Sequence, residues 1–226
     1  MDFVLTVLSY TWLPLLISAV TAYLLGSLDF AIIVTKAFTH EDIREKGSGN
    51  AGATNVLRSH GKKLAALTSL GDVGKAVVSA LLAQFVWFPL CGVAHLGYYG
   101  AFVAGAACVI GHMYPLYFGF RGGKGVLTVL GMMLVVDWPT ALIGLGVFAI
   151  VVLLSKMVSL GSILAGVALC LSIFIRFKYV VHESAACIAF VTAMTIFVVG
   201  LAVMKHSANI KRILNGTENK IGQKKS

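Results

Sequence analysis

The chain has 226 residues, of which 58% are hydrophobic and only 12% are charged, and its mean hydropathy is +0.91. Soluble domains carry about twice this fraction of charged residues, so the composition excludes a soluble globular protein. It predicts an all-α polytopic membrane protein, which we expect to form one integral-membrane domain over residues 1–226. The net charge of +9 does not indicate a nucleic-acid partner, because Lys and Arg gather in short segments between apolar stretches, as membrane topology favours.

Apolar stretches follow one another along the whole chain. They cover residues 3–28 (extending weakly to 38), 64–90, 93–116, 126–136, 139–154, 157–175 and 179–204. Several exceed the roughly 18 residues that mark a candidate transmembrane helix. The first stretch has no basic segment before it and is too long for a cleavable signal peptide, so we interpret it as the first membrane span.

The region 126–154 allows two interpretations, because Asp137-Trp-Pro139 interrupts it. Proline breaks or kinks a helix, so the region forms either one long kinked helix or a hairpin of two short helices. The hairpin gives seven transmembrane helices, with the N-terminus outside and the C-terminus cytoplasmic. It places 15 of the 18 Lys and Arg residues on the cytoplasmic side, whereas the single helix would move the cations of the tail outside. The distribution of positive charge therefore favours seven helices, some of them short.

A glycine-rich polar segment, Gly47-Ser-Gly-Asn-Ala-Gly-Ala-Thr-Asn-Val-Leu-Arg58, follows the first apolar stretch. Glycine lets backbone N–H groups converge on an anion, and a helix start adds the positive end of its dipole. We expect tight turns at Gly47, Gly49 and Gly52, and a helix from about Thr54 that carries Arg58 one turn further on the same face. A glycine-rich interfacial loop with ordinary helix caps is the alternative.

A second glycine-rich segment, Phe120-Arg-Gly-Gly-Lys-Gly125, precedes the short stretch 126–136. It is not a Walker A loop, because no Ser or Thr follows Lys124, but glycines beside a lysine at a helix start can form a nest for an anion. A helix of this length measures about 16 Å and cannot cross a hydrocarbon core of about 30 Å alone. We therefore expect the loop to be recessed in the membrane. A charged loop that only sets topology is the alternative.

Charged residues within the apolar stretches are few. Asp72 and Lys75 are three residues apart, and we expect them to form an ion pair with a structural role. Direct contact with a substrate is the alternative. The chain has no Gly-x-Ser-x-Gly, His-x4-Asp or His-Glu-x-x-His motif and no carboxylate pair at metal-binding spacing, so we expect neither a metal nor a cofactor. Chemistry would depend on positioning and positive charge, which suits anionic substrates that are already activated.

The tail and one helix start offer further polar candidates. A helix through Lys205, His206 and Asn209 would place the first and last of these on one face, and Gly216 would end the helix that precedes the segment Gly216-Thr-Glu-Asn-Lys220. Ser159 lies at a predicted helix start, where it can meet a ligand on the cytoplasmic side or serve in capping and packing.

Together these segments resemble the bacterial acyl-phosphate-dependent glycerol-3-phosphate acyltransferases, the PlsY family. The resemblance rests on five motifs in order along the chain: Tyr23-Leu-Leu-Gly-Ser27, the segment 47–58, Gly111-His-Met-Tyr-Pro115, Phe120-Arg-Gly-Gly-Lys-Gly-Val126 and Gly216-Thr-Glu-Asn-Lys220. The departures are small and remove no motif cation. Asp29 stands where the family usually has proline, Leu127 replaces a common alanine, and Ser207-Ala208 replaces a more polar pair.

The resemblance implies an enzyme of a bacterial inner (cytoplasmic) membrane, with its active site facing the cytoplasm. It would transfer a fatty acyl group from acyl phosphate to the 1-hydroxyl of sn-glycerol 3-phosphate, giving lysophosphatidic acid and inorganic phosphate in the first acylation step of phospholipid synthesis. The implied mechanism uses no protein base and no covalent acyl-enzyme, because a phosphate oxygen of the donor accepts the hydroxyl proton. The residues implied to hold glycerol 3-phosphate in catalysis are Ser48, Arg58, Lys124, His206 and Asn209. The residues implied to bind the acyl phosphate are Asn50, Thr54, Asn55 and the backbone of Gly122 and Gly123, with Ser159 a weaker candidate. Gly52 is a further substrate-binding residue, and Glu218 would have a structural role, tying the tail to the site.

A membrane transporter or channel for phosphate-like anions is the alternative function. The same glycine loops would then form a selectivity site, and the interruption at Asp137 would be a transport device. The absence of an inverted repeat in the sequence counts against this alternative. A structural subunit of a lipid-handling complex would leave both glycine-rich segments unexplained.

Overall fold

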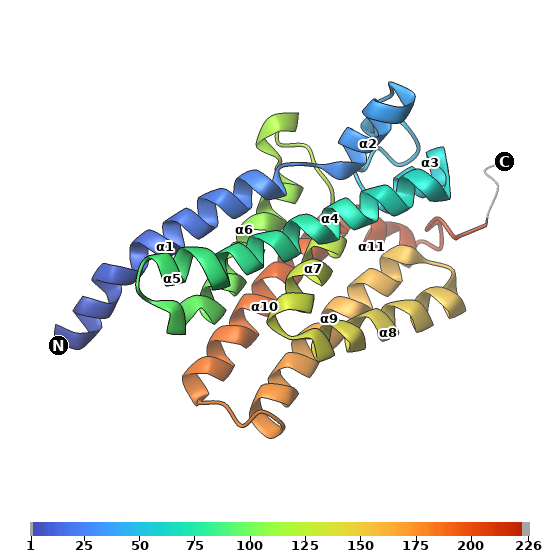
Figure 1. The fold of residues 1–226 in the computed structure, drawn as a ribbon. Helices are drawn as coiled ribbons and strands as arrows, with labels where there is room; N and C mark the ends of the chain where they lie inside the picture. The colour runs from blue at the N-terminus through green and yellow to red at the C-terminus, as the bar shows by residue number, and fades with distance from the viewer. Residues whose placement is uncertain (1, 223–226) are drawn as a thin grey trace. The chain divides into compact units, whose positions relative to one another are not determined.

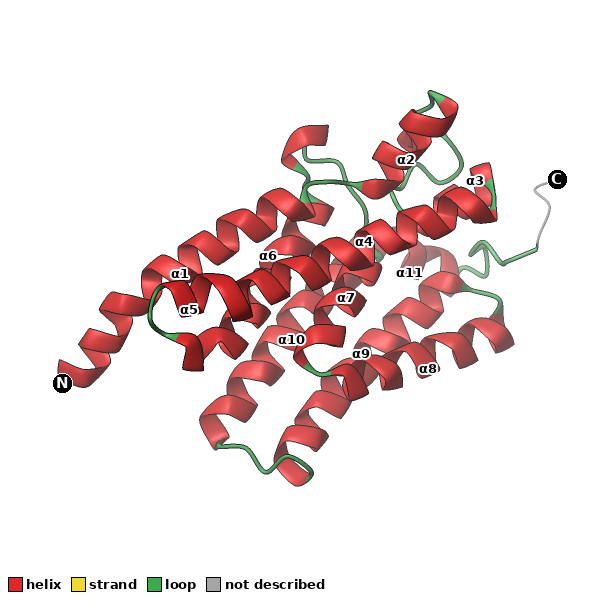
Figure 2. Cartoon of the chain, viewed as in Figure 1, coloured by secondary structure: helices red, strands yellow, loops and turns green. Residues whose placement is uncertain are grey.

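The structure is a computed structural model that describes residues 2–222, with the side chains of residues 11–222 (Figures 1 and 2). The described residues form helices and loops and no strand, which confirms the predicted all-α class (Figure 2). Contacts divide the chain into two compact units, the N-terminal unit up to Val136 and the C-terminal unit from Asp137. The single domain over residues 1–226 stays a prediction.

The N-terminal unit contains both glycine-rich segments. Its α-helices are α1 (Asp2–Gly26), α2 (Phe30–Thr39), α3 (Ala53–His60), α4 (Lys62–Leu82), α5 (Phe88–Leu90), α6 (Gly97–Met113) and α7 (Val126–Val136). Short 3₁₀ turns lie at η1 (Ile43–Glu45), η3 (Ala94–Leu96) and η4 (Leu116–Phe118), and a π-helical turn, η2 (Ala83–Trp87), continues α4.

Close helix packing in the N-terminal unit depends on glycine. α1 runs along α6, and a Cβ atom on Gly26 would collide with the carbonyl group of Cys108. A Cβ atom on Gly111 would likewise meet the carbonyl oxygen of Tyr23, so the two helices touch backbone to backbone. Gly131 brings α7 equally close to the backbone of α4. Small residues at these positions are typical of helix interfaces in membranes, where close van der Waals contact drives association.

The C-terminal unit consists of α8 (Trp138–Ser155), α9 (Val158–Tyr179), α10 (Ala185–Lys205) and α11 (Ser207–Leu214). α9 packs against both α8 and α10 (Figure 1). Asp137 caps α8 by accepting a hydrogen bond from the N–H of Thr140, and it also accepts two from Arg176 of α9, at 2.9 and 3.1 Å. These bonds tie the start of α8 to the last turns of α9.

The region 126–154 is not one continuous helix. α7 ends at Val136, Asp137 has a non-helical backbone with φ −159° and ψ 84°, and α8 begins at the next residue. Among the described residues, six helical segments are long and apolar enough to cross a membrane: Thr11–Thr39, Lys62–Leu90, Ala94–Phe118, Trp138–Ser155, Val158–Tyr179 and Ala185–Lys205. α7 is apolar but shorter, as predicted. The count of seven transmembrane helices and the orientation of the termini stay predictions.

Candidate active site

The first glycine-rich loop begins with two turns that glycine adopts readily. Gly47 and Gly49 have φ angles of 58° and 70°, in the left-handed region where a Cβ atom is strained. Gly52 differs from the expected tight turn: its backbone is extended, and it precedes α3, which begins at Ala53, one residue before Thr54. Because Gly52 has no side chain, it offers no cap to the first N–H groups of α3, and this suits an anion site at a helix start.

Asn55 holds this loop together from inside. The residue is only 2% exposed, and the two hydrogens of its amide nitrogen are shared among the carbonyl groups of Ile43, Lys46 and Asn50, at 2.9–3.1 Å. Its Oδ1 atom accepts a hydrogen bond from the N–H of Ser48 at 3.0 Å. The motif asparagine therefore has a scaffold role that sequence reasoning missed, and its predicted contact with acyl phosphate stays a prediction.

The second glycine-rich loop, residues 120–125, lies against the first. A Cβ atom on Gly123 would collide with the carbonyl oxygen of Ala51 and with Nε2 of His112. The N–H of Gly123 also donates to the carbonyl group of His112 over 3.1 Å. Glycine at this position thus lets two loops that are far apart in the sequence come into contact. α7 begins at Val126, directly after the loop, which confirms the predicted helix start.

The predicted substrate-binding side chains of the two loops differ in exposure. Ser48 and Arg58 are exposed, whereas Asn50, Thr54 and Lys124 are half-buried. Thr54 and Arg58 lie four residues apart on α3, as predicted, so they share a face of that helix. The N-terminal unit thus brings a lysine and an arginine to the ends of two adjoining glycine-rich loops.

A buried charged cluster lies beside the second loop. Lys75 forms the predicted ion pair with Asp72 at 2.8 Å, and its ammonium group also donates to the carbonyl group of Leu28 at 2.8 Å. Nδ1 of His112 lies 3.0 Å from this ammonium group. The same Nδ1 atom lies 3.4 Å from the carboxylate of Asp72, and Nε2 of the ring is the atom beside Gly123. The carbonyl group of His112 also packs against Gly122. Sequence reasoning predicted the ion pair but missed the histidine that joins it to the loop.

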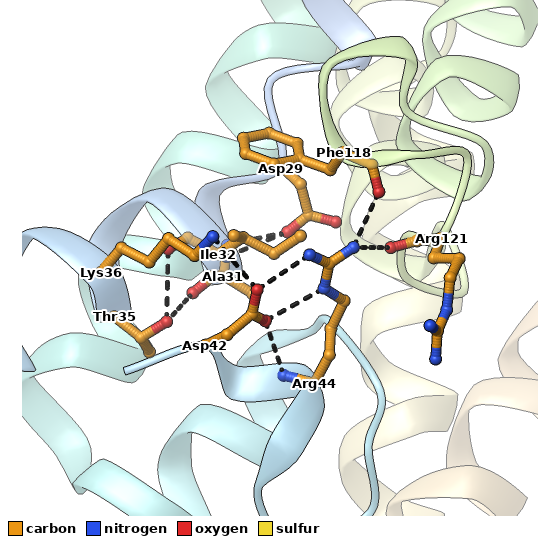
Figure 3. Close-up of polar contacts among 9 residues, drawn as sticks. All are labelled: Asp29, Ala31, Ile32, Thr35, Lys36, Asp42, Arg44, Phe118 and Arg121. Carbon is orange, nitrogen blue, oxygen red and sulfur yellow. Dashed lines mark hydrogen bonds and ion pairs between the residues drawn. The ribbon is translucent and has the colours of Figure 1, made fainter. Parts of the chain in front are cut away.

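Two residues of the first family motif fasten the turn before the second loop. Tyr23 donates to the carbonyl group of Tyr114 at 2.9 Å, and the hydroxyl oxygen of Ser27 accepts from the N–H of Leu116 at 3.2 Å. Asp29, where the family usually has proline, caps α2 by accepting hydrogen bonds from two of its first N–H groups (Figure 3). This departure from the motif therefore serves local helix structure.

In the C-terminal unit, Glu218 is the centre of a polar network. One carboxylate oxygen accepts from the hydroxyl of Ser159 at 2.7 Å and from the amide of Asn209 at 2.8 Å, and the other accepts from Nε of Arg212 at 2.8 Å. Burial by itself would raise the pKa of Glu218, but these three hydrogen bonds outweigh it and hold the pKa below its ordinary value. The carboxylate thus joins the tail to α9 and α11, while the ligand contacts predicted for these residues stay predictions.

The helix expected through Lys205, His206 and Asn209 is interrupted. α10 ends at Lys205, His206 has φ −94° and ψ 7°, and α11 begins at the next residue. The prediction that Lys205 and Asn209 share a helix face is therefore wrong. The reason is local, because Nδ1 of the buried His206 donates to the carbonyl group of Ala202, in the last turn of α10, at 2.7 Å. α10 ends at this turn, and the first turn of α11 follows it. Gly216 follows α11 with φ 69°, as the predicted helix end requires.

Known proteins are similar to this chain in sequence and in fold. The profile of the family described as glycerol-3-phosphate acyltransferase matches residues 16–216. A glycerol-3-phosphate acyltransferase of Clostridioides difficile (strain 630) is 46% identical over 210 residues, which cover 93% of this chain and 97% of that protein. One from Thermoanaerobacter sp. (strain X514) is 40% identical, over 92% of this chain and 96% of that protein.

Solved structures agree with the sequence relatives. The crystal structure of PlsY (YgiH), an integral membrane glycerol 3-phosphate acyltransferase, in its glycerol 3-phosphate form matches with a TM-score of 0.79 at 37% identity. The match covers 92% of this chain and 96% of that one. The lysophosphatidic acid form of that protein matches with a TM-score of 0.77 at 36% identity, over 92% and 95% of the two chains. With its apolar helices, this chain is a multi-pass membrane protein, and it belongs to the glycerol-3-phosphate acyltransferase family of PlsY.

Proposed function

We propose that this protein transfers a fatty acyl group from an acyl phosphate to the 1-hydroxyl of sn-glycerol 3-phosphate. The observation that carries the proposal is the contact between the two glycine-rich loops at Ala51 and Gly123. Acyl transfer between two phosphate-bearing substrates needs two neighbouring anion sites, and each loop joins backbone N–H groups to a helix start and a cation. The glycerol 3-phosphate and lysophosphatidic acid forms of the solved relative support the acceptor and the product.

The proposed reaction is a direct displacement. The acceptor hydroxyl oxygen attacks the acyl carbonyl carbon, a new ester C–O bond forms, and the bond from that carbon to the bridging phosphate oxygen breaks. The phosphate leaves with the bonding electrons, and one of its oxygens takes the hydroxyl proton. The products are lysophosphatidic acid and inorganic phosphate, with no covalent acyl-enzyme. Orienting two such substrates can contribute on the order of 7–11 kcal/mol to the barrier reduction.

In this proposal the loops bind phosphate groups and the cations stabilise the charge that develops on them. Arg58 offers a planar fork for phosphate oxygens, and Lys124 supplies a point charge at the start of α7. The hydroxyl group of Ser48 forms a hydrogen bond with the acceptor, glycerol 3-phosphate. The positive charge of the loops supports a cytoplasmic position for this face of the protein, and we propose that the N-terminus lies outside a bacterial inner membrane.

The identity of the acyl donor can be tested with purified protein in detergent. Palmitoyl phosphate and glycerol 3-phosphate should yield lysophosphatidic acid and one equivalent of phosphate, whereas palmitoyl-CoA should yield no product. Initial rates at varied concentrations of both substrates should give intersecting reciprocal plots, as direct transfer requires. Parallel plots with release of phosphate in the absence of acceptor would point instead to a covalent acyl-enzyme.

Lys124→Ala tests the second loop. We expect turnover to fall about 10²–10³-fold, because a preorganised group that stabilises charge in the transition state is lost. Lys63→Ala, at an exposed position near the start of α4, is the matched control and should keep full activity. Near-normal turnover of Lys124→Ala would remove this lysine from the site. Flux of phosphate into liposomes by a protein that makes no product would favour the transporter alternative.

A further inference from the structure

Arg44, which lies just before the first glycine-rich loop, reaches across to the turn that leads into the second. Its Nη1 atom donates to the carbonyl groups of Phe118 at 2.7 Å and Arg121 at 3.3 Å (Figure 3). These two carbonyl groups stand on either side of Gly119 and Phe120. One guanidinium group therefore holds both ends of the turn that leads into Gly122.

Asp42 fixes the direction of this guanidinium group. Its carboxylate accepts from Nε of Arg44 at 3.0 Å and from Nη2 at 2.8 Å, in the two-pronged geometry that suits an arginine (Figure 3). The hydrogen bonds from Arg44 hold the pKa of Asp42 well below its usual range, so the pair stays charged. Asp42 also accepts from the N–H of Arg44 at 3.0 Å, which fixes the backbone of η1 (Ile43–Glu45).

The turn held by Arg44 is one that needs support. Phe120 has φ 60°, in the left-handed region that a bulky residue adopts only with backbone strain. The N–H of Phe120 donates to the carbonyl group of Pro115 at 2.9 Å, and Arg44 provides the contacts from outside the turn. Such a conformation persists where its surroundings over-determine it.

Arg44 has little capacity left for a phosphate group. A guanidinium group has five N–H donors, and the two bonds to Asp42 and the two to the turn occupy four of them. Its bonding therefore differs from what a substrate-binding arginine requires, namely a fork that points at the ligand. The pattern is that of a brace between two segments.

We propose that Arg44, oriented by Asp42, is a positioning residue that sets the second glycine-rich loop against the first. The inference rests on the proposed function, in which the two loops together hold the phosphate groups of the two substrates. Without these Arg44 contacts the first loop keeps its own groups for glycerol 3-phosphate, but the two reacting groups lose their alignment. The main effect should therefore fall on kcat, with little change in the KM for glycerol 3-phosphate.

The test compares Arg44→Lys, Arg44→Gln and Asp42→Asn with the wild-type protein. A misplacement of about 1 Å can cost on the order of 10²-fold in rate, so both Arg44 variants should lose about that factor in kcat, with KM for glycerol 3-phosphate within about threefold. Asp42→Asn keeps a neutral acceptor and should lose about tenfold. Lys36→Gln is the control: Lys36 also pairs with Asp42, at 3.2 Å, but it is 51% exposed, so kcat should not change.

Hydrogen exchange of the backbone amides of residues 116–122 gives a second measurement. Exchange should be faster in Arg44→Lys than in the wild type, while exchange within α6 should not change. Full kcat in Arg44→Lys would overturn the inference, because charge alone would then suffice. A KM raised tenfold at unchanged kcat would overturn it too, since Arg44 would then bind substrate. If the Arg44 variants fail to fold, Asp42→Asn decides, and a wild-type kcat there counts against the brace. A wild-type protein with no acyl phosphate activity would instead refute the proposed function.

Discussion

Lys75→Met is the change whose effect on stability can be worked out most directly from the structure. The side chains of Lys75 and Asp72 are 2% and 1% exposed, and their charged atoms are 2.8 Å apart. The substitution also removes the donor to the carbonyl group of Leu28 and to Nδ1 of His112. Removing one partner of a buried ion pair costs about 3–5 kcal/mol, because the other charge stays buried. The unfolding equilibrium constant should therefore rise by a factor of about 10² to 10⁴.

A double-mutant cycle separates the ion pair from the other contacts of the lysine. Asp72→Asn alone should cost less than Lys75→Met, because Leu28 and His112 still accept from the ammonium group. The double variant Asp72→Asn/Lys75→Met leaves no unpaired charge. Its loss should therefore be smaller than the sum of the single losses by about 0.5–3 kcal/mol, the range seen for residues in one network.

The measurement is reversible unfolding in mixed detergent and sodium dodecyl sulfate micelles, followed by far-ultraviolet circular dichroism. Lys63→Met is the matched control, because it makes the same substitution at an exposed position of the same helix and should change stability by less than about 0.5 kcal/mol. A Lys75→Met protein as stable as the control would refute the reasoning. Strict additivity in the cycle would show that the ion pair is not the source of the effect.

Three further predictions concern other parts of the structure. The pKa of Glu218 is lower in the folded protein than its ordinary value of 4.5. The carboxylate therefore contributes fully to stability above pH 4.5, and this contribution is lost as the pH falls through the pKa of the folded state. Thermal unfolding of the wild type should therefore depend on pH below 4.5 more steeply than that of Glu218→Gln, and equal slopes would contradict this. Gly123→Ala should separate the two loops and lower kcat about 10²-fold. The control is Gly74→Ala, which should leave kcat unchanged because a Cβ atom at this position meets nothing within 4 Å. Equal kcat values for the two variants would argue against the loop contact. Asp137→Asn keeps a capping side chain but weakens both hydrogen bonds from Arg176. We therefore expect the free energy of unfolding to fall by about 1.5–3 kcal/mol in the same unfolding assay. Wild-type stability in this variant would show that the ion pair adds nothing.

Sequence reasoning succeeded where a local pattern decides the structure. The break at Asp137 and the helix start after Gly125 follow from proline, glycine and hydropathy in neighbouring residues. The ion pair of Asp72 and Lys75 could be predicted for the same reason, since three residues along a helix bring the two onto one side.

The missed contacts are those between segments that are distant in the sequence. Arg44 and Phe118 are 74 residues apart, and no local pattern indicates that the guanidinium group meets that carbonyl group. Asn55 could be predicted as a polar residue of a glycine-rich loop, but its three carbonyl partners depend on how the preceding segment folds back. The interruption at His206 was missed because a side chain that bonds its own helix leaves no mark in the hydropathy pattern.

The glycine contacts between α1 and α6 also limit how this protein can change in evolution. Gly111, which allows α6 to touch the backbone of α1, immediately precedes His112, which carries the contacts to the second loop. A larger residue at position 111 would move helix and histidine together, so variation in the helix interface and in the loop cannot be selected independently. A substitution at position 111 should therefore alter the second loop as well as the helix interface.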